Sequence, residues 1–145
     1  MKRKNTLGVT LLEIMLVLAI AAMVIIMSIR YYQSSSLSEQ ANAGMEEIQA
    51  IIAAMDNIAN GGGGNYSGIT TSTLTAVVGS TNMVSPTGGT VTFTASTDGI
   101  TYGISMPLGS ACTQVLAKVA SNIKITSPAC AVDGTFSYTY NNNAT

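Results

Sequence analysis

Near its N-terminus the chain has a long apolar run, which is followed by apolar positions in a helical pattern. Residues 9–29 are nearly all apolar, and 21 residues are enough for one helix to cross a bilayer. Over residues 30–59 the apolar or small side chains recur every three or four positions, as on one face of a helix. These are Leu37, Ala41, Gly44, Met45, Ile48, Ile51, Ile52, Met55, Ile58 and Ala59. The pattern predicts one helix from about Val9 to Ala59, amphipathic over 30–59.

The opposite face of this predicted helix is polar. It carries Glu39, Asn42, Glu46, Gln49 and Asp56. The apolar stripe needs a cover, which the C-terminal region must supply. The alternative is a helical hairpin that breaks at the three serines of 34–36.

A connecting region follows over residues 60–89. Four consecutive glycines, 61–64, predict the end of the helix and a flexible connector. No Gly-Lys-Ser/Thr follows and no strand precedes them, which argues against a phosphate-binding loop. One short helical turn is predicted at 72–78.

Residues 90–145 alternate in the manner of strands, with one helix between them. Residues 90–94 and 100–106 are β-rich and flank Asp98-Gly99, a strong hairpin signal. Further short strands are predicted at 123–126 and 136–140. The intervening helix has apolar positions at Cys112, Val115, Leu116, Val119 and Ala120, with Ser110 or the residue before it as the cap. The whole pattern predicts an α+β fold in which a small antiparallel sheet packs on the outer half of the long helix.

The composition narrows the classes of function that the chain could have. Only 9% of the 145 residues are charged and there is no histidine, so acid–base catalysis, a metal site or a bound cofactor has little support. Three of the six basic residues are Lys2, Arg3 and Lys4. Without them, three basic and seven acidic side chains remain, which gives no basic patch for direct nucleic-acid binding.

Glu13 is the unusual residue of the apolar run. A carboxylate within a membrane helix costs about 2.5–3.5 kcal/mol on insertion scales unless it is paired. A cleaved secretory signal peptide or a plain anchor has no use for it. The run is also longer than a typical signal core, and it ends in Arg30-Tyr31-Tyr32 in place of a small-residue cleavage site.

The N-terminal segment Leu7-Gly8-Val9-Thr10-Leu11-Leu12-Glu13-Ile14 resembles the class III signal of type IV prepilins. In that family a prepilin peptidase removes the short basic leader after a glycine and methylates the new N-terminus. The resemblance implies that residues 1–8 are the leader, that cleavage falls between Gly8 and Val9, and that residues 9–29 form the transmembrane and polymerisation helix. It covers about 25 residues.

The resemblance also assigns a role to Glu13. It implies that the Glu13 carboxylate pairs with the Val9 amine of a neighbouring subunit during assembly. An intrachain pair between the two groups is the alternative. Residues 60–89 then correspond to the αβ-loop of pilins. The insertion of a helix between the two halves of the sheet resembles the heads of type IVb pilins and of the pilins of conjugative thin pili.

The two cysteines, Cys112 and Cys130, follow a membrane-spanning start and are expected outside the cytoplasm, where disulfides persist. A bridge would close 19 residues and contribute about 3 kcal/mol in the loop-entropy account. Two buried free thiols are the alternative. In the pilin family the segment between them corresponds to the D-region, often a surface for contact or recognition.

The expected function is therefore that of a structural subunit and not an enzyme. Its partners would be further copies of itself, the inner membrane before assembly, the prepilin peptidase and the pilus assembly machinery, and it would end in an extracellular filament. The sequence leaves open whether the filament serves adhesion, aggregation, conjugation, DNA uptake or motility. The other possibilities are a type II secretion pseudopilin and a single-pass membrane binding protein that never polymerises.

Overall fold

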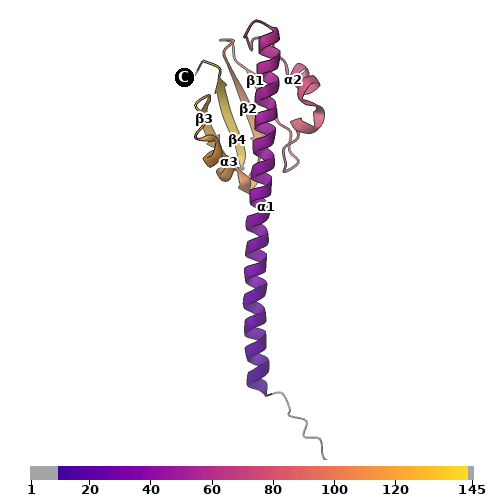
Figure 1. Cartoon of the computed structure of the whole chain (residues 1–145), viewed down its shortest axis with the longest axis vertical. Coiled ribbons are helices and arrows are strands. Elements are labelled where there is room, and N and C mark those ends of the chain that lie inside the picture. Colours follow the sequence, from indigo (N-terminus) through magenta and orange to yellow (C-terminus); the bar gives the residue numbers. More distant parts are fainter. Residues whose placement is uncertain (1–9, 144–145) are drawn as a thin grey trace, which may run out of the picture. The chain divides into compact units, whose positions relative to one another are not determined.

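A computed structural model describes residues 10–143 of the chain, which have an α+β architecture (Figure 1). The elements in order are α1 (Leu11–Gly61), α2 (Thr71–Val78), the 3-10 helix η1 (Ser80–Met83), β1 (Thr92–Ala95), β2 (Thr101–Pro107), the 3-10 helix η2 (Gly109–Ala111), α3 (Cys112–Val119), β3 (Ile125–Cys130) and β4 (Thr135–Asn141). The chain divides into two compact units, residues 1–36 and 37–145, and each is described by itself.

The predicted long helix is confirmed, with bounds two residues later at each end. The three serines of 34–36 do not break it, so the hairpin alternative is wrong. In the N-terminal unit the helix begins after Thr10, whose hydroxyl oxygen accepts a hydrogen bond from the Glu13 amide at 3.3 Å. The side chains of 10–35 are all exposed.

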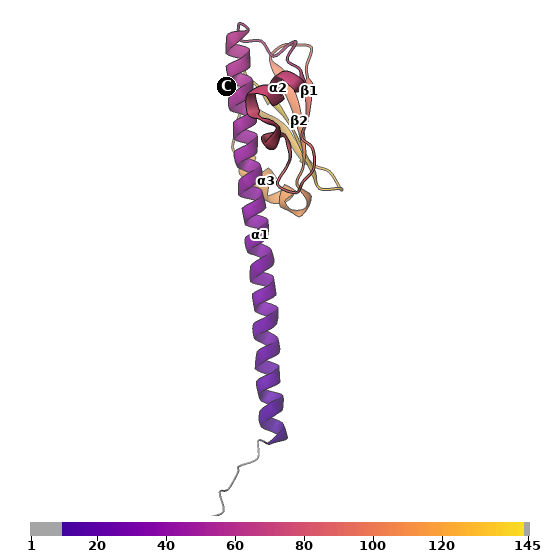
Figure 2. The same ribbon diagram turned by 90° about the vertical axis from the view of Figure 1, so that its right-hand side faces the viewer.

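The C-terminal unit is built around the second part of α1. Eight residues of this part are buried, at helical spacing: Ala41, Gly44, Glu47, Ile48, Ile51, Ala54, Met55 and Ala59. Figure 1 and Figure 2 both show the sheet alongside this part of the helix. The predicted apolar stripe therefore packs in the core of this unit together with residues of the sheet, α2 and α3.

One antiparallel sheet of four strands has the order β1-β2-β4-β3. The hairpin predicted around Asp98-Gly99 is confirmed, with Phe93 opposite Ile104. Strands β2 and β4 alternate strictly, because each second residue is buried. The buried set is Tyr102, Ile104, Met106, Phe136, Tyr138 and Tyr140.

Several boundaries differ from the expected ones. The first strand starts at Thr92, because Thr90 only forms an isolated bridge with Val84. The strand expected at 123–126 begins at Ile125 and reaches Cys130, with an irregularity between Thr126 and Ala129. The short helical turn predicted at 72–78 is confirmed as α2, and residues 60–89 also contain η1, which the sequence pattern did not predict.

The inserted helix is confirmed as α3, but its predicted cap is wrong. Ser110 lies inside η2, and no side chain caps the start of α3. The 3-10 turn runs directly into the α-helix and makes a side-chain cap at Ser110 unnecessary. Val115 and Val119 are buried on the face of α3 that joins the core.

Candidate assembly surface

The N-terminal unit presents an apolar surface that its own residues leave uncovered. Every large apolar side chain of α1 between Leu11 and Ile29 is at least half exposed. This helix is long and apolar enough to cross a membrane. An exposed apolar surface of this extent marks a site for contact with lipid or protein.

Glu13 lies on this surface, in the first turn of α1. Ile14, Val17 and Leu18 surround it on the same side of the helix and are exposed. A carboxylate in the first turn is favourable because the N-terminal amides of a helix carry partial positive charge. With Thr10 three positions earlier, Glu13 also fits a capping-box pattern, Thr-x-x-Glu. Its position therefore supports a local capping role as well as contact with another chain.

The predicted processing residues, Gly8 and Val9, lie outside the described residues. The Glu13–Val9 pair, within a chain or between chains, is likewise not observed and stays a prediction. Within the described residues, Glu13 and Arg30 are the charged groups of the N-terminal unit. Arg30 is exposed, and no ion pair or hydrogen bond engages its guanidinium within residues 10–143.

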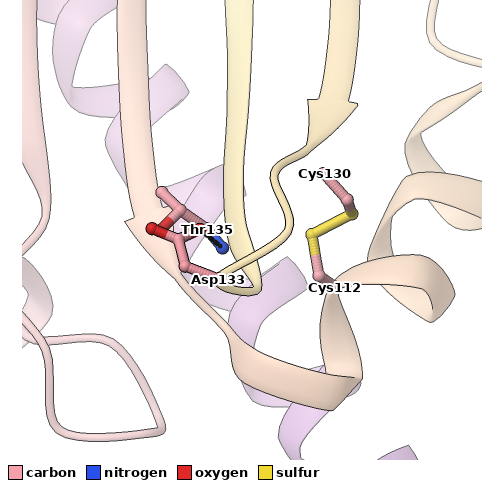
Figure 3. Close-up of a disulfide and its surroundings, with 4 residues drawn as sticks. All are labelled: Cys112, Cys130, Asp133 and Thr135. Carbon is pink, nitrogen blue, oxygen red and sulfur yellow. Dashed lines mark hydrogen bonds between the residues drawn. A yellow bond between two sulfur atoms is a disulfide. The ribbon is translucent and has the colours of Figure 1, made fainter.

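The two cysteines form the predicted disulfide, which links α3 to the end of β3 (Figure 3). Their Cα atoms are 6.0 Å apart. The adjoining hairpin turn is held by Asp133, whose carboxylate accepts a hydrogen bond from the Thr135 amide at 2.9 Å. This bond and the Thr135 side chain lower the pKa of Asp133.

The sequence pattern places Asp56 on the polar face of the long helix, but the structure places it partly in the core of the C-terminal unit. It is half-buried and accepts a hydrogen bond from the Tyr66 hydroxyl at 2.6 Å, with the Tyr140 hydroxyl at 3.4 Å from its other oxygen. Burial first, and then the bond to Asp56, raise the pKa of Tyr66. The rings of Tyr66 and Tyr102 meet edge to face at 5.0 Å between centroids. The cluster fixes α1 to the segment after it and to the sheet.

Glu47 is the least expected charged residue of the C-terminal unit. Its side chain is only 9% exposed, and its Oε1 accepts no hydrogen bond from the described residues. Burial raises the pKa of Glu47 to about 7. Nearby on β4, Tyr138 is also buried with an unpaired hydroxyl. Burial raises the pKa of Tyr138, with smaller contributions from Tyr140 and Glu47. An unpaired buried polar group costs about 1–3 kcal/mol.

Glu47 lines a groove of about 320 Å³ on the C-terminal unit, which we call the Glu47 groove. One wall is a face of α1 and the other is the segment from η1 to the first strand. The lining residues are Ala43, Glu46, Glu47, Ala50, Thr81, Asn82, Val84 and Pro86. The two carboxylates thus share the groove with apolar side chains and with the uncharged polar Thr81 and Asn82, and no cationic side chain is among the lining residues.

Sequence reasoning missed Glu47, although a signal was present. It lies three positions after Gly44 and four before Ile51, both of which belong to the predicted apolar stripe. Helical spacing therefore places position 47 on the buried face. The acidic type of the residue, and not its position, obscured its burial.

No protein-family model, curated protein or solved structure matches this chain. The case for its function therefore rests on its own residues.

Proposed function

We propose that the chain is a type IV pilin-like subunit that is anchored in a membrane by α1 and then polymerises through the same helix into a filament. The observation that carries this proposal is the exposed apolar surface between Leu11 and Ile29 with a carboxylate at Glu13. A membrane covers such a surface in the precursor, and parallel copies of the helix cover it in a filament.

The position of Glu13 relative to the expected cleavage supports polymerisation over simple anchoring. After removal of residues 1–8, Glu13 is the fifth residue, and the new amine at Val9 is the nearest cation in sequence. Pairing between chains neutralises both groups within the apolar filament core, and it selects one register between neighbours. The other role of Glu13, in the capping box, would also operate in a monomer.

The C-terminal unit supports a role outside the cytoplasm. It contains a disulfide, which is typical of oxidising compartments. A pilin head on a filament and the head of a pseudopilin both meet this description. A single-pass membrane binding protein, the remaining candidate, is also compatible with α1, which within residues 10–143 is long and apolar enough to cross a membrane.

The test separates the charge of Glu13 from its capping role. Glu13→Gln keeps a side chain suited to a capping box but removes the charge, whereas Thr10→Ala removes the cap and keeps the charge. We expect Glu13→Gln to reach the membrane at the normal level and to lose at least tenfold in sheared filament. A penalty of about 1.4 kcal/mol at each addition lowers each equilibrium constant tenfold.

Thr10→Ala is the control and should assemble nearly normally. Filament yield at the wild-type level from Glu13→Gln would show that the charge does not drive docking. Loss of filament from Thr10→Ala alone would instead assign the effect to the start of the helix.

A further inference from the structure

The Glu47 groove has the chemistry of a receptor for a cationic side chain with an apolar stem. Glu46 and Glu47 are adjacent on one wall, and Ala43, Val84 and Pro86 provide apolar contacts. Glu47 is only 9% exposed as a residue, and its Oε1 is buried and accepts no hydrogen bond from the described residues. The Asn82 amide nitrogen donates a hydrogen bond to the Val78 carbonyl at 2.8 Å, and this side chain is uncharged.

An arginine suits these features better than a small ion. Its aliphatic stem can pack on apolar wall residues while its guanidinium remains beside the carboxylates. The planar guanidinium donates two parallel hydrogen bonds to one carboxylate and has further donors for a second. Two carboxylates are too few for the six to eight oxygen ligands that calcium takes, unless backbone and water oxygens complete the set.

Arg30 is the described basic residue that lacks a partner. Lys118 donates to Asn42, and Lys124 lies 3.4 Å from the Asn142 oxygen and over the ring of Tyr140. The guanidinium of Arg30 is exposed and unengaged within residues 10–143. Side chains on one helix meet at spacings of three or four positions, and Arg30 and Glu47 are 17 positions apart on α1. Arg30 therefore reaches a groove only on another copy.

We propose that the Glu47 groove of one subunit receives Arg30 of a neighbouring subunit in the filament. This inference rests on the proposed function and specifies a second contact, apart from Glu13 and Val9. Glu39 and Glu46 are both exposed, so water solvates each of them and an ion pair to either alone gains little. Glu46 differs from Glu39 because it lines the groove beside the buried Glu47. If α1 keeps its rise in the filament, the two copies are displaced by about 25 Å along the helix axis.

The experiment uses filaments of the full chain with Arg30→Lys, treated with a water-soluble carbodiimide that joins an amine to a touching carboxylate. We expect an amide between position 30 of one chain and Glu46 or Glu47 of another, identified by mass spectrometry of cross-linked peptides. Adding Glu46→Gln and Glu47→Gln should reduce its yield at least tenfold. The matched control, Glu39→Gln, should leave the yield unchanged.

Filaments in which position 30 links to Glu39, or to no carboxylate, would overturn the inference while the proposed function stands. If wild-type protein forms no filaments, the proposed function fails and the inference fails with it. If the Arg30→Lys protein does not assemble, a charge-exchange experiment tests the inference in its place. Arg30→Glu should abolish filaments and the added Glu46→Arg should restore them, and absence of rescue would overturn the inference.

Discussion

The two parts of α1 are both rich in apolar residues, yet they have opposite environments. Between Leu11 and Ser36 no side chain is buried, whereas between Leu37 and Gly61 eight residues are buried. The second part has a polar face and an apolar stripe, and the stripe packs within the C-terminal unit. The first part is apolar around most of its circumference.

This difference implies that the second part of α1 stabilises the fold, whereas the first part is available for contacts with lipid or with other chains. Each Å² of apolar surface removed from water contributes about 25 cal/mol, and the second part of α1 gains this within its own chain. The first part must gain it from lipid or from other chains. Substitutions in the two parts should therefore have distinct consequences, one on folding of the C-terminal unit and the other on membrane and filament contacts.

The largest expected effect on stability comes from replacing Met55, and Met23 on the same helix provides the comparison. Met55 is fully buried and Met23 is 65% exposed. Met55→Ala should lower the free energy of unfolding by about 3–4 kcal/mol, because it leaves a cavity in the core. Met23→Ala should change it by less than about 0.5 kcal/mol. Thermal unfolding of the full chain in detergent, followed by near-ultraviolet circular dichroism of the tyrosines, measures both.

Equal losses from the two substitutions would contradict the division of α1 into a folding part and an association part. Met23→Ala also serves as the control for the general effect of removing a methionine from this helix. Its consequence, if any, should appear in filament yield.

Loss of the disulfide should have the next largest effect. Replacing Cys112 and Cys130 together by serine should lower the stability of the C-terminal unit by about 3 kcal/mol, because the unfolded chain regains the freedom that the closed loop removes. The amount of protein in the membrane fraction after a short pulse of synthesis should not change, since the N-terminal unit lacks cysteine. Protease resistance of the C-terminal unit measures the first effect. Unaltered resistance would show that the bridge contributes little.

A smaller and pH-dependent effect is expected at Glu47. Its pKa is raised by burial from 4.5 to about 7, so the folded state holds its proton more tightly than the unfolded state. Stability therefore falls as pH rises from about 4.5 through 7. Glu47→Gln should remove this fall and make the unassembled protein more stable than wild type by about 2 kcal/mol at pH 8, after allowance for solvent at the groove.

Thermal unfolding of the unassembled full chain in detergent at pH 5 and pH 8 measures the Glu47 prediction. Glu39→Gln, at an exposed position of the same helix, is the control and should leave the pH dependence unchanged. A wild-type slope that persists in Glu47→Gln would mean that another group causes it.

Much of the fold follows from periodicity in the sequence. The long helix, the Asp98-Gly99 hairpin and α3 each have a strong local pattern, and each is confirmed. The extension of β3 to Cys130 was not predictable in this way. Only Ile125 is buried in this strand, and its pairing with β4 is irregular between Thr126 and Ala129, so the sequence lacks a regular alternation of apolar and polar residues. Pairing with β4 and the disulfide hold the strand in place.

The candidate surface was only partly predictable. Glu13 stands out because a charge interrupts an apolar run, and that signal is local. Asp56 does not stand out, because its environment depends on residues far away in sequence, such as Tyr140. Glu47 does not stand out because its acidic type obscures the helical spacing that places it on the buried face. Polar residues on a helix are ordinarily assigned to its exposed face, and tertiary contacts decide the exceptions.

We propose that the N-terminal helix is released from a short leader and then joins copies of the chain. Intact mass and N-terminal sequencing of sheared, purified filaments test it most directly. We expect that the filaments contain this chain, that it begins at Val9 and that its amine is methylated. A filament subunit that begins at Met1 or beyond Ile29, or surface filaments that lack this chain, would contradict it.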